Sequence, residues 1–379
     1  MTDLSELRVQ LDEIDDQIVS LYERRMKVAE EVAEYKISTG KKVYDKEREM
    51  AKLASVKAKT HGELNARGIE ELYEQIMSIS RKLQYRKIME SVHGDKIYER
   101  LPFIAMDSID KSAKVVYQGA AGSYSEAAMK QFFGENVNCT NVATFRDAML
   151  VLEEGLAQYA VLPIENSTAG IVNEIYDLLA EFEHFIVAEQ VIRIEHCLLG
   201  CEGTTLDTIQ NVYSHPQSLM QSEHFLREHS SWNQVSMSNN AFAANMVAEE
   251  KDITKAAIAS EYAAKCYGLH IIKKGVNDNS CNSTRFIIVS NQKVFLKDAG
   301  KISVCFEIPH ESGSLYHILS HFIYNGLNMT KIESRPIEGK TWEYRFFIDF
   351  EGNLADSGVK NALCGLREEV TNLRILGNY

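Results

Sequence analysis

The fold is decided by the stretch Val161-Leu162-Pro163-Ile164-Glu165-Asn166-Ser167-Thr168-Ala169-Gly170, where an apolar segment ends abruptly in polar residues. The apolar run from Tyr159 to Ile164 predicts a short buried strand. Residues 172–179 then have the apolar spacing of a helix. Open α/β sheets bind ligands where a strand ends and a helix begins, so we expect a functional site here. The alternative is a simple helix cap by Asn166, Ser167 or Thr168, although one residue would suffice for a cap.

Length, charge and cysteine content restrict the class of protein. The chain has 379 residues, which favours about two or three domains, and its net charge of −13 argues against nucleic acid as a partner. No apolar run reaches membrane-spanning length, and residues 1–30 lack a signal-peptide pattern. The seven cysteines are scattered, which argues against structural zinc and predicts reduced thiols in a cytoplasmic protein without a metal.

Residues 4–36 form one long predicted helix with an apolar seam. The seam consists of Leu4, Leu7, Leu11, Ile14, Ile18, Leu21, Val28, Val32 and Tyr35, and its steps of three and four suit packing against another helix. Arg25 interrupts the seam, and a buried guanidinium needs an anion, either a nearby Glu or a ligand. Lys36 lies eleven residues later, on nearly the same face. Arg8 points about a quarter-turn away, so it would reach the same pocket from a second copy in an intertwined dimer.

Two further helices are expected after Gly40, one from about Tyr44 and one over residues 66–89. Polar residues recur on them at helical spacing, and with those of the first helix they resemble the all-helical chorismate mutases over residues 1–90. The resemblance implies a role for eight residues. Arg8, Arg25 and Arg48 would bind carboxylates, Lys36 and Gln84 would flank the ether oxygen, and Asp45, Glu49 and Ser80 would hold the hydroxyl and ring-carboxylate region.

The chemistry of such a site follows from its substrate. Chorismate is a dianion that rearranges within itself, so the reaction needs neither a nucleophile nor a base. It needs a compact substrate conformer and stabilisation of the charge that develops on the ether oxygen. Planar arginines clamp carboxylates, and Lys36 and Gln84 would donate hydrogen bonds at the breaking C–O bond.

After a predicted linker over residues 91–113, strands and helices alternate from Val115 onward. Residues Gly119 to Ser125 form a glycine-rich turn before a helix, and backbone N–H groups at such a position can hold an anion. The third glycine of the dinucleotide fingerprint is missing, which argues against a nicotinamide cofactor. The hydroxyls of Ser123 and Ser125 suit a carboxylate.

Two more polar clusters lie beside predicted strands, Ser214-His215-Pro216-Gln217 and Thr284-Arg285 just before the strand Phe286 to Val289. Together with the glycine-rich turn and the cluster at Glu165, they resemble prephenate dehydratase over residues 114–290. The resemblance implies a two-lobed, periplasmic-binding-protein-like α/β fold with Thr284 as the catalytic threonine. The other implied cleft residues are Ser123, Glu165, Asn166, Ser167, Ser214, His215, Gln217, Arg285 and Phe286.

The dehydratase reaction removes carbon dioxide and a ring hydroxyl together. A threonine hydroxyl has no useful acidity, so Thr284 can act as a positioned donor or relay. Glu165 and His215 are both candidates for the proton source, and the sequence leaves the choice open. Arg285 would bind a substrate carboxylate or, alternatively, form a salt bridge at the lobe junction.

Residues 301–379 follow a short charged linker and have the order β-α-β-β-α-β of an α+β ferredoxin-like domain. They resemble an ACT domain, the regulatory module that binds amino acids at a subunit interface. The resemblance implies phenylalanine binding by Gly313, Ser314 and Leu315, and by Glu333, Ser334, Arg335 and Pro336. A purely structural dimerisation module is the alternative.

The sequence thus predicts a bifunctional enzyme that forms prephenate from chorismate and phenylpyruvate from prephenate, without a cofactor. Phenylalanine would be its feedback inhibitor, and the chain would form a homo-oligomer, a dimer or a tetramer. Two alternatives are a small-molecule sensor without chemistry and a mutase fused to prephenate dehydrogenase. The dehydrogenase would need the nicotinamide fingerprint that the sequence lacks.

Overall fold

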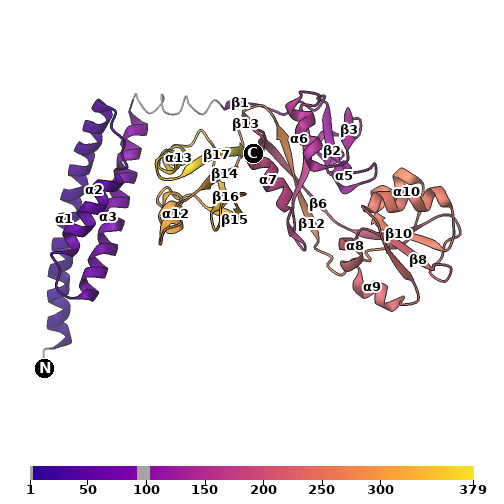
Figure 1. The fold of residues 1–379 in the computed structure, drawn as a ribbon, viewed down its shortest axis with the longest axis horizontal. Coiled ribbons are helices and arrows are strands. Elements are labelled where there is room, and N and C mark those ends of the chain that lie inside the picture. The colour runs from indigo at the N-terminus through magenta and orange to yellow at the C-terminus, as the bar shows by residue number, and fades with distance from the viewer. Residues whose placement is uncertain (1–2, 92–102) are drawn as a thin grey trace. The chain divides into compact units, whose positions relative to one another are not determined.

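The computed structural model describes residues 3–91 and 103–379 (Figure 1). The chain divides into two compact units. One contains the N-terminal helices together with residues 300–375, and the other contains residues 103–299 with residues 376–379. None of the helices in the described ranges combines the length and apolar character that crossing a membrane requires.

Three helices begin the first unit: α1 (Leu4–Thr39), α2 (Lys46–Lys57) and α3 (Glu63–Glu90). Gly40 ends α1 in the left-handed region at φ 68°, where glycine is unstrained. Asp45 caps α2 by accepting a hydrogen bond from the Arg48 N–H. Helix α2 begins two residues after its predicted start, and α3 begins three residues before and ends one residue after its predicted limits.

The apolar seam of α1 is largely uncovered within one chain. Leu11, Ile14 and Ile18 are each more than half exposed, at 58%, 51% and 54%. The helix buries Ala29 and Ala33 on its C-terminal half. An apolar stripe of this length favours a helical partner outside this chain.

The C-terminal part of the same unit has the predicted β-α-β-β-α-β order. Its elements are β14 (Lys301–Glu307), α12 (Ser314–Tyr324), β15 (Met329–Pro336), β16 (Tyr344–Glu351), α13 (Ser357–Glu369) and β17 (Thr371–Asn378). The strands lie in the order β15-β16-β14-β17, which is the ferredoxin-like arrangement. The α+β prediction for this region is confirmed.

Helix α3 packs against α12 and α13 through a buried, polar contact surface. A Cβ on Gly365 would lie 3.2 Å from the ring of Tyr85 and 2.4 Å from that of His321, so only glycine fits there. The Tyr85 hydroxyl donates to Glu368. The Lys82 ammonium is 2.7 Å from the Ser320 hydroxyl, and burial lowers the pKa of Lys82 to about 8.

The second unit has two α/β lobes, as predicted. The first lobe contains β2 (Val115–Gln118), α5 (Tyr124–Phe133), β3 (Cys139–Val142), α6 (Phe145–Glu153), β4 (Tyr159–Asn166), β5 (Gly170–Ile171), α7 (Asn173–Glu181), β6 (Phe185–Arg193) and β12 (Ser283–Ser290). Its strands lie in the order β6-β12-β4-β2-β3, and β5 pairs with β4. Apolar residues from both faces fill a core that includes Met129, Val161 and Phe286.

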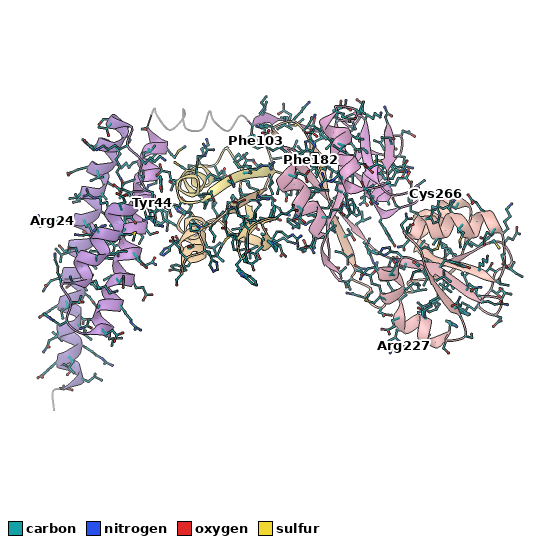
Figure 2. The ribbon with its side chains drawn as sticks, viewed as in Figure 1. Arg24, Tyr44, Phe103, Phe182, Arg227 and Cys266 are labelled. Atoms are coloured by element: carbon teal, nitrogen blue, oxygen red, sulfur yellow. The ribbon has the colours of Figure 1, made fainter. Side chains whose placement is uncertain are left out.

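The second lobe is inserted between β6 and β12. It contains β7 (His196–Gly200), β8 (Asn211–Ser214), α8 (Pro216–Met220), α9 (Glu223–Glu228), β9 (Asn233–Ser236), α10 (Asn240–Glu250), β10 (Lys255–Ser260), α11 (Glu261–Tyr267) and β11 (His270–Lys274). The strand order is β11-β7-β10-β8-β9. Arg227 on α9 and Cys266 on α11 are exposed residues of this lobe, and both are labelled in Figure 2.

Two segments expected to be linkers contain strands. Within predicted linker 91–113, Ile104–Met106 forms β1, and after Ser290, Val294–Leu296 forms β13. These strands pair in parallel as a two-stranded sheet. Residues 92–102 of the predicted linker lie outside the described residues.

Candidate functional sites

A cavity of about 610 Å³ opens among α1, α2 and α3. The structure brings seven of the eight residues of the predicted mutase site to its wall. These are Arg25, Lys36, Asp45, Arg48, Glu49, Ser80 and Gln84. Arg8 lies exposed near the start of α1 and does not line the cavity. The cavity holds both signs of charge, with cations in excess.

Lys36 and Gln84 meet across two helices inside this cavity. The Lys36 Nζ is 3.0 Å from Gln84 Oε1 and 2.8 Å from the carbonyl of Val43. Gln84 Nε2 donates to the carbonyl of Ser80 one turn earlier. Burial lowers the pKa of Lys36, which is the effect expected of an ammonium held away from water.

Arg25 enters the cavity from α1 and is held by uncharged groups. Its Nη1 donates to the Ser80 hydroxyl at 2.5 Å and contacts the carbonyl of Ile76 at 3.5 Å. The alternative interpretation, a pair with a nearby Glu, is not the observed arrangement. Burial lowers the pKa of Arg25, so an incoming anion would find an incompletely compensated guanidinium.

Arg81 is a cavity residue that the sequence analysis missed. It follows Ser80 directly, and its Nη1 is 2.5 Å from the Glu49 carboxylate. A charged residue beside a predicted site residue on the same helix was the available signal. Two consecutive cations on a helix are typical of a solvated face, whereas Arg81 and Lys82 are 7% and 3% exposed.

A second cavity, of about 300 Å³, lies in the unit that contains the two lobes. Four residues of the predicted dehydratase site line it, namely Ser123, His215, Thr284 and Phe286. Tyr124, Asn239, Asn240 and Ser260 also line it and were not predicted. Asn239 is the N-cap of α10, and Ser260 is the N-cap of α11. A Ser or Asn directly before a helical apolar pattern is the sequence signal that could have identified them.

The sequence analysis placed Thr284 just before a strand. In the structure, Thr284 is the second residue of β12. Its Oγ1 accepts a hydrogen bond of 2.9 Å from Asn166 Nδ2, which also donates to Asn282 Oδ1. Asn166 Oδ1 accepts from the N–H groups of Thr168 and Ala169 and so closes a turn. Helix α7 begins at Asn173, and its N-cap residue Val172 makes no side-chain hydrogen bond, so the helix-cap alternative for Asn166, Ser167 and Thr168 is wrong.

Glu165 and Arg285 lie away from Thr284. They are paired in register between β4 and β12, and the period of two in a strand places Arg285 on the opposite face from Thr284 and Phe286. Arg285 forms ion pairs with Glu165 at 3.1 Å and with Glu189 at 3.3 Å. Of the two roles left open for Arg285, the observed one is a salt bridge.

His215 caps the short helix α8, where its Nδ1 accepts from the N–H of Gln217 at 3.2 Å. Burial lowers the pKa of His215, which favours the neutral ring. The neighbouring Ser214 is fully buried, and its hydroxyl contacts the carbonyl of Ile258. Ser167 and Ser283 exchange hydrogen bonds beside Thr284. Ser167, Ser214 and Gln217 do not line the cavity.

The predicted effector segments lie at two places in the ferredoxin-like region. Gly313, Ser314 and Leu315 line a cavity of about 330 Å³ with the aromatic residues Tyr316, Trp342, Tyr344 and Phe346. Gly313 has φ 81° and is the N-cap residue of α12. Glu333, Ser334, Arg335 and Pro336 belong to the edge strand β15 and do not line this cavity.

Comparisons with known proteins cover the whole chain. Residues 7–85 match the model of the family chorismate mutase type II, and residues 115–294 match that of prephenate dehydratase. A bifunctional chorismate mutase/prephenate dehydratase of Aquifex aeolicus is 31% identical over 380 residues, which covers 100% of this chain and 98% of that protein.

Two solved structures are similar over 70% of the chain. One is prephenate dehydratase from Arthrobacter aurescens in complex with L-Phe, at 30% identity, a TM-score of 0.66 and 89% coverage of that chain. The other is GqqA, described as a quorum quenching acylase, at 33% identity, a TM-score of 0.64 and 96% coverage. The two family models match consecutive parts of this chain, and the Aquifex relative matches the chain over its whole length. The chain therefore belongs to the family of bifunctional chorismate mutase/prephenate dehydratases.

Proposed function

We propose that this chain converts chorismate to prephenate in the helical cavity and prephenate to phenylpyruvate in the cavity lined by Thr284. The meeting of Lys36 and Gln84 inside a cation-rich cavity of about 610 Å³ is the observation that carries the first step. Relatives that combine the two activities match the chain over its whole length, which supports both steps.

Lys36 and Gln84 keep hydrogen-bond donors available for the ether oxygen of chorismate. An ammonium has three donors, and two of those of Lys36 are directed at Val43 and Gln84. The Gln84 amide has two donors, one of which is used by Ser80. In a buried site such donors stabilise the charge on the breaking bond without reorganisation. Arg25 and Arg48 would bind the two carboxylates.

Arg8 would complete the site from a second copy of the chain. It lies exposed on α1, next to the uncovered apolar seam, and does not line the cavity of its own chain. Pairing of this seam with that of another copy would bury the apolar residues and bring a third arginine to the substrate. The proposed assembly is therefore a homo-oligomer built on α1.

In the dehydratase cavity, the Thr284 hydroxyl is positioned to donate a hydrogen bond. Because Asn166 Nδ2 donates to Thr284 Oγ1, the hydroxyl hydrogen of Thr284 is left for another acceptor, the departing ring hydroxyl. Of the two candidates, His215 lines the cavity of Thr284, whereas Glu165 is engaged with Arg285. Because Nδ1 of His215 accepts from the Gln217 N–H, the neutral ring carries its hydrogen on Nε2 and can donate a hydrogen bond from there to the departing oxygen. Transfer of a proton from His215 requires the protonated ring.

Phenylalanine would bind at the start of α12. The helix N-terminus and the backbone at Gly313 suit a carboxylate, and the aromatic wall of the 330 Å³ cavity suits the ring. The Arthrobacter relative is in complex with L-Phe, which supports this effector. Residues Glu333 to Pro336 would join the site from another subunit. The proposed domain limits remain 1–90, 114–290 and 301–379.

Incubating the purified chain with chorismate tests the proposal by product. The expected product is phenylpyruvate, formed without any added cofactor. Unchanged chorismate would indicate a sensor without chemistry, and prephenate that disappears after addition of a nicotinamide cofactor would indicate a dehydrogenase. Prephenate supplied directly tests the second step alone.

A further inference from the structure

Arg81 stands between the mutase cavity and the ferredoxin-like region. Its Nη1 contacts Glu49, which lines the cavity. Its Nε and Nη2 contact the two carboxylate oxygens of Glu369 on α13, at 2.9 and 3.4 Å. The ring of Tyr44, labelled in Figure 2, lies 5.0 Å from the guanidinium carbon. One buried cation thus joins a carboxylate of each region.

The charges of this cluster are mutually dependent. Burial alone would lower the pKa of Arg81, but Glu369 and Glu49 outweigh it and raise the pKa above its ordinary value. The Glu369 side chain is only 6% exposed, and this burial would raise its pKa, yet His321 and Arg81 lower the pKa below its ordinary value. His321 Nε2 lies 3.2 Å from Glu369 Oε1. Removing one member would leave a buried charge unpaired.

Glu49 needs a partner if the cavity binds a dianion. A free carboxylate in the wall would repel the substrate and would be free to rotate, whereas a paired one is both neutralised and fixed in direction. Arg81 is the residue that supplies this pairing at 2.5 Å. The bidentate contact with Glu369 in turn fixes the guanidinium plane.

We propose that Arg81 is a positioning residue of the mutase site, which holds Glu49 for the substrate and ties its position, through Glu369, to the ferredoxin-like region. This inference rests on the mutase function proposed above. A shift of α13 relative to α3 would pull on Arg81 and change the support of Glu49. Chorismate binding and the placement of α13 would then be coupled in both directions.

Kinetics of Arg81 and Glu369 variants of the full chain test the proposal. Arg81→Met should raise the mutase KM for chorismate about tenfold or more, with a smaller loss in kcat, because an unpaired Glu49 weakens binding of the dianion in ground and transition state alike. Arg81→Lys should recover a large part of the KM. Glu369→Gln should raise the KM about threefold, and no further change should follow when it is added to Arg81→Met.

Ser320→Ala is the matched control. It removes a hydrogen bond across the same surface, the contact with Lys82, without touching Arg81, Glu49 or Glu369. It should leave the mutase KM unchanged. Circular dichroism melting of each variant checks that the folded fraction at assay temperature equals that of the parent.

Three results would overturn the proposal. The first is a mutase KM in Arg81→Met equal to that of the parent. The second is an Arg81→Lys variant whose KM is as high as that of Arg81→Met. The third is an equal rise in KM when Glu369→Gln is made in the parent and in Arg81→Met. Lys36→Ala separates this inference from the underlying function. If Lys36→Ala retains mutase activity, the assignment of the site fails. If it abolishes activity while Arg81→Met has no effect, the role of Arg81 alone fails.

Discussion

At the scale of single residues, both proposed sites depend on hydrogen bonds that fix which donor faces the substrate. The contact of Lys36 with Gln84 and that of Asn166 with Thr284 each leave a hydrogen free in a cavity. Helical spacing placed Lys36 on the same face as Arg25, and the resemblance to the two enzyme families implied the roles of Lys36, Gln84 and Thr284. The sequence did not predict Arg81, because its burial arises from α13, which is remote in sequence.

Lys36→Ala should lower the mutase rate by about a hundredfold or more, since a charge-assisted donor to the transition state is lost. Dehydration of supplied prephenate should be unchanged, because its cavity lies in the other unit. Both rates are measured on the same preparation. A mutase rate near that of the parent would contradict the role of Lys36.

The pH dependence of the mutase should reflect the same lysine. Burial lowers the pKa of Lys36, and the site needs its protonated form, so kcat/KM should fall as the pH rises through a value below that of an exposed lysine. Lys36→Arg should move this loss to higher pH, whatever its effect on the maximal rate. An alkaline limb that is the same in both proteins would assign the titration to another group.

Thr284→Ala should abolish dehydration and spare the mutase, whereas Thr284→Ser should keep part of the activity, because serine retains a hydroxyl near Asn166. Phenylpyruvate formation from prephenate measures both variants. Equal losses in the two would show that the hydroxyl is not the operative group.

At the scale of elements, helices with a strong apolar period were predictable, and the strands of the second lobe were less so. Helix α1 begins at the predicted residue and extends three residues beyond its predicted end. Strands β7, β9 and β11 were not predicted. Strand β7 pairs with β10 and β11, which are distant in sequence, and the short strand β9 pairs in parallel with β8. Side chains alternate between the two faces along β12, so Arg285 lies on the face opposite Thr284. This could be predicted only if the strand was known to include both residues, and β12 begins at Ser283.

The uncovered seam of α1 should be an interface between two copies. Mixing inactive Arg8→Ala chains with inactive Arg25→Ala chains should restore part of the mutase activity, because a hybrid dimer contains one site with both arginines. Subunit exchange is followed independently by mass spectrometry of the mixed species. Exchange without recovered activity would place Arg8 outside the site.

At the scale of the whole molecule, the ferredoxin-like region should make dehydration sensitive to phenylalanine. Gly313→Ala adds a Cβ 3.4 Å from His317 at a backbone φ of 81°, which strains the start of α12. The variant should need more phenylalanine for half-inhibition while its uninhibited dehydratase rate stays the same. Unchanged inhibition would place phenylalanine elsewhere, for example in the cavity of Thr284.

The buried ammonium of Lys82 makes the contact between α3 and α12 a proton-linked equilibrium. With a pKa of about 8, Lys82 is largely neutral at pH 9 in the packed form, whereas an exposed lysine is charged there. The packed form therefore gains stability as the pH rises from about 8 towards 10. Any ligand that loosens this contact at pH 9 takes up protons as it binds, and calorimetric heats would then vary with the ionisation enthalpy of the buffer.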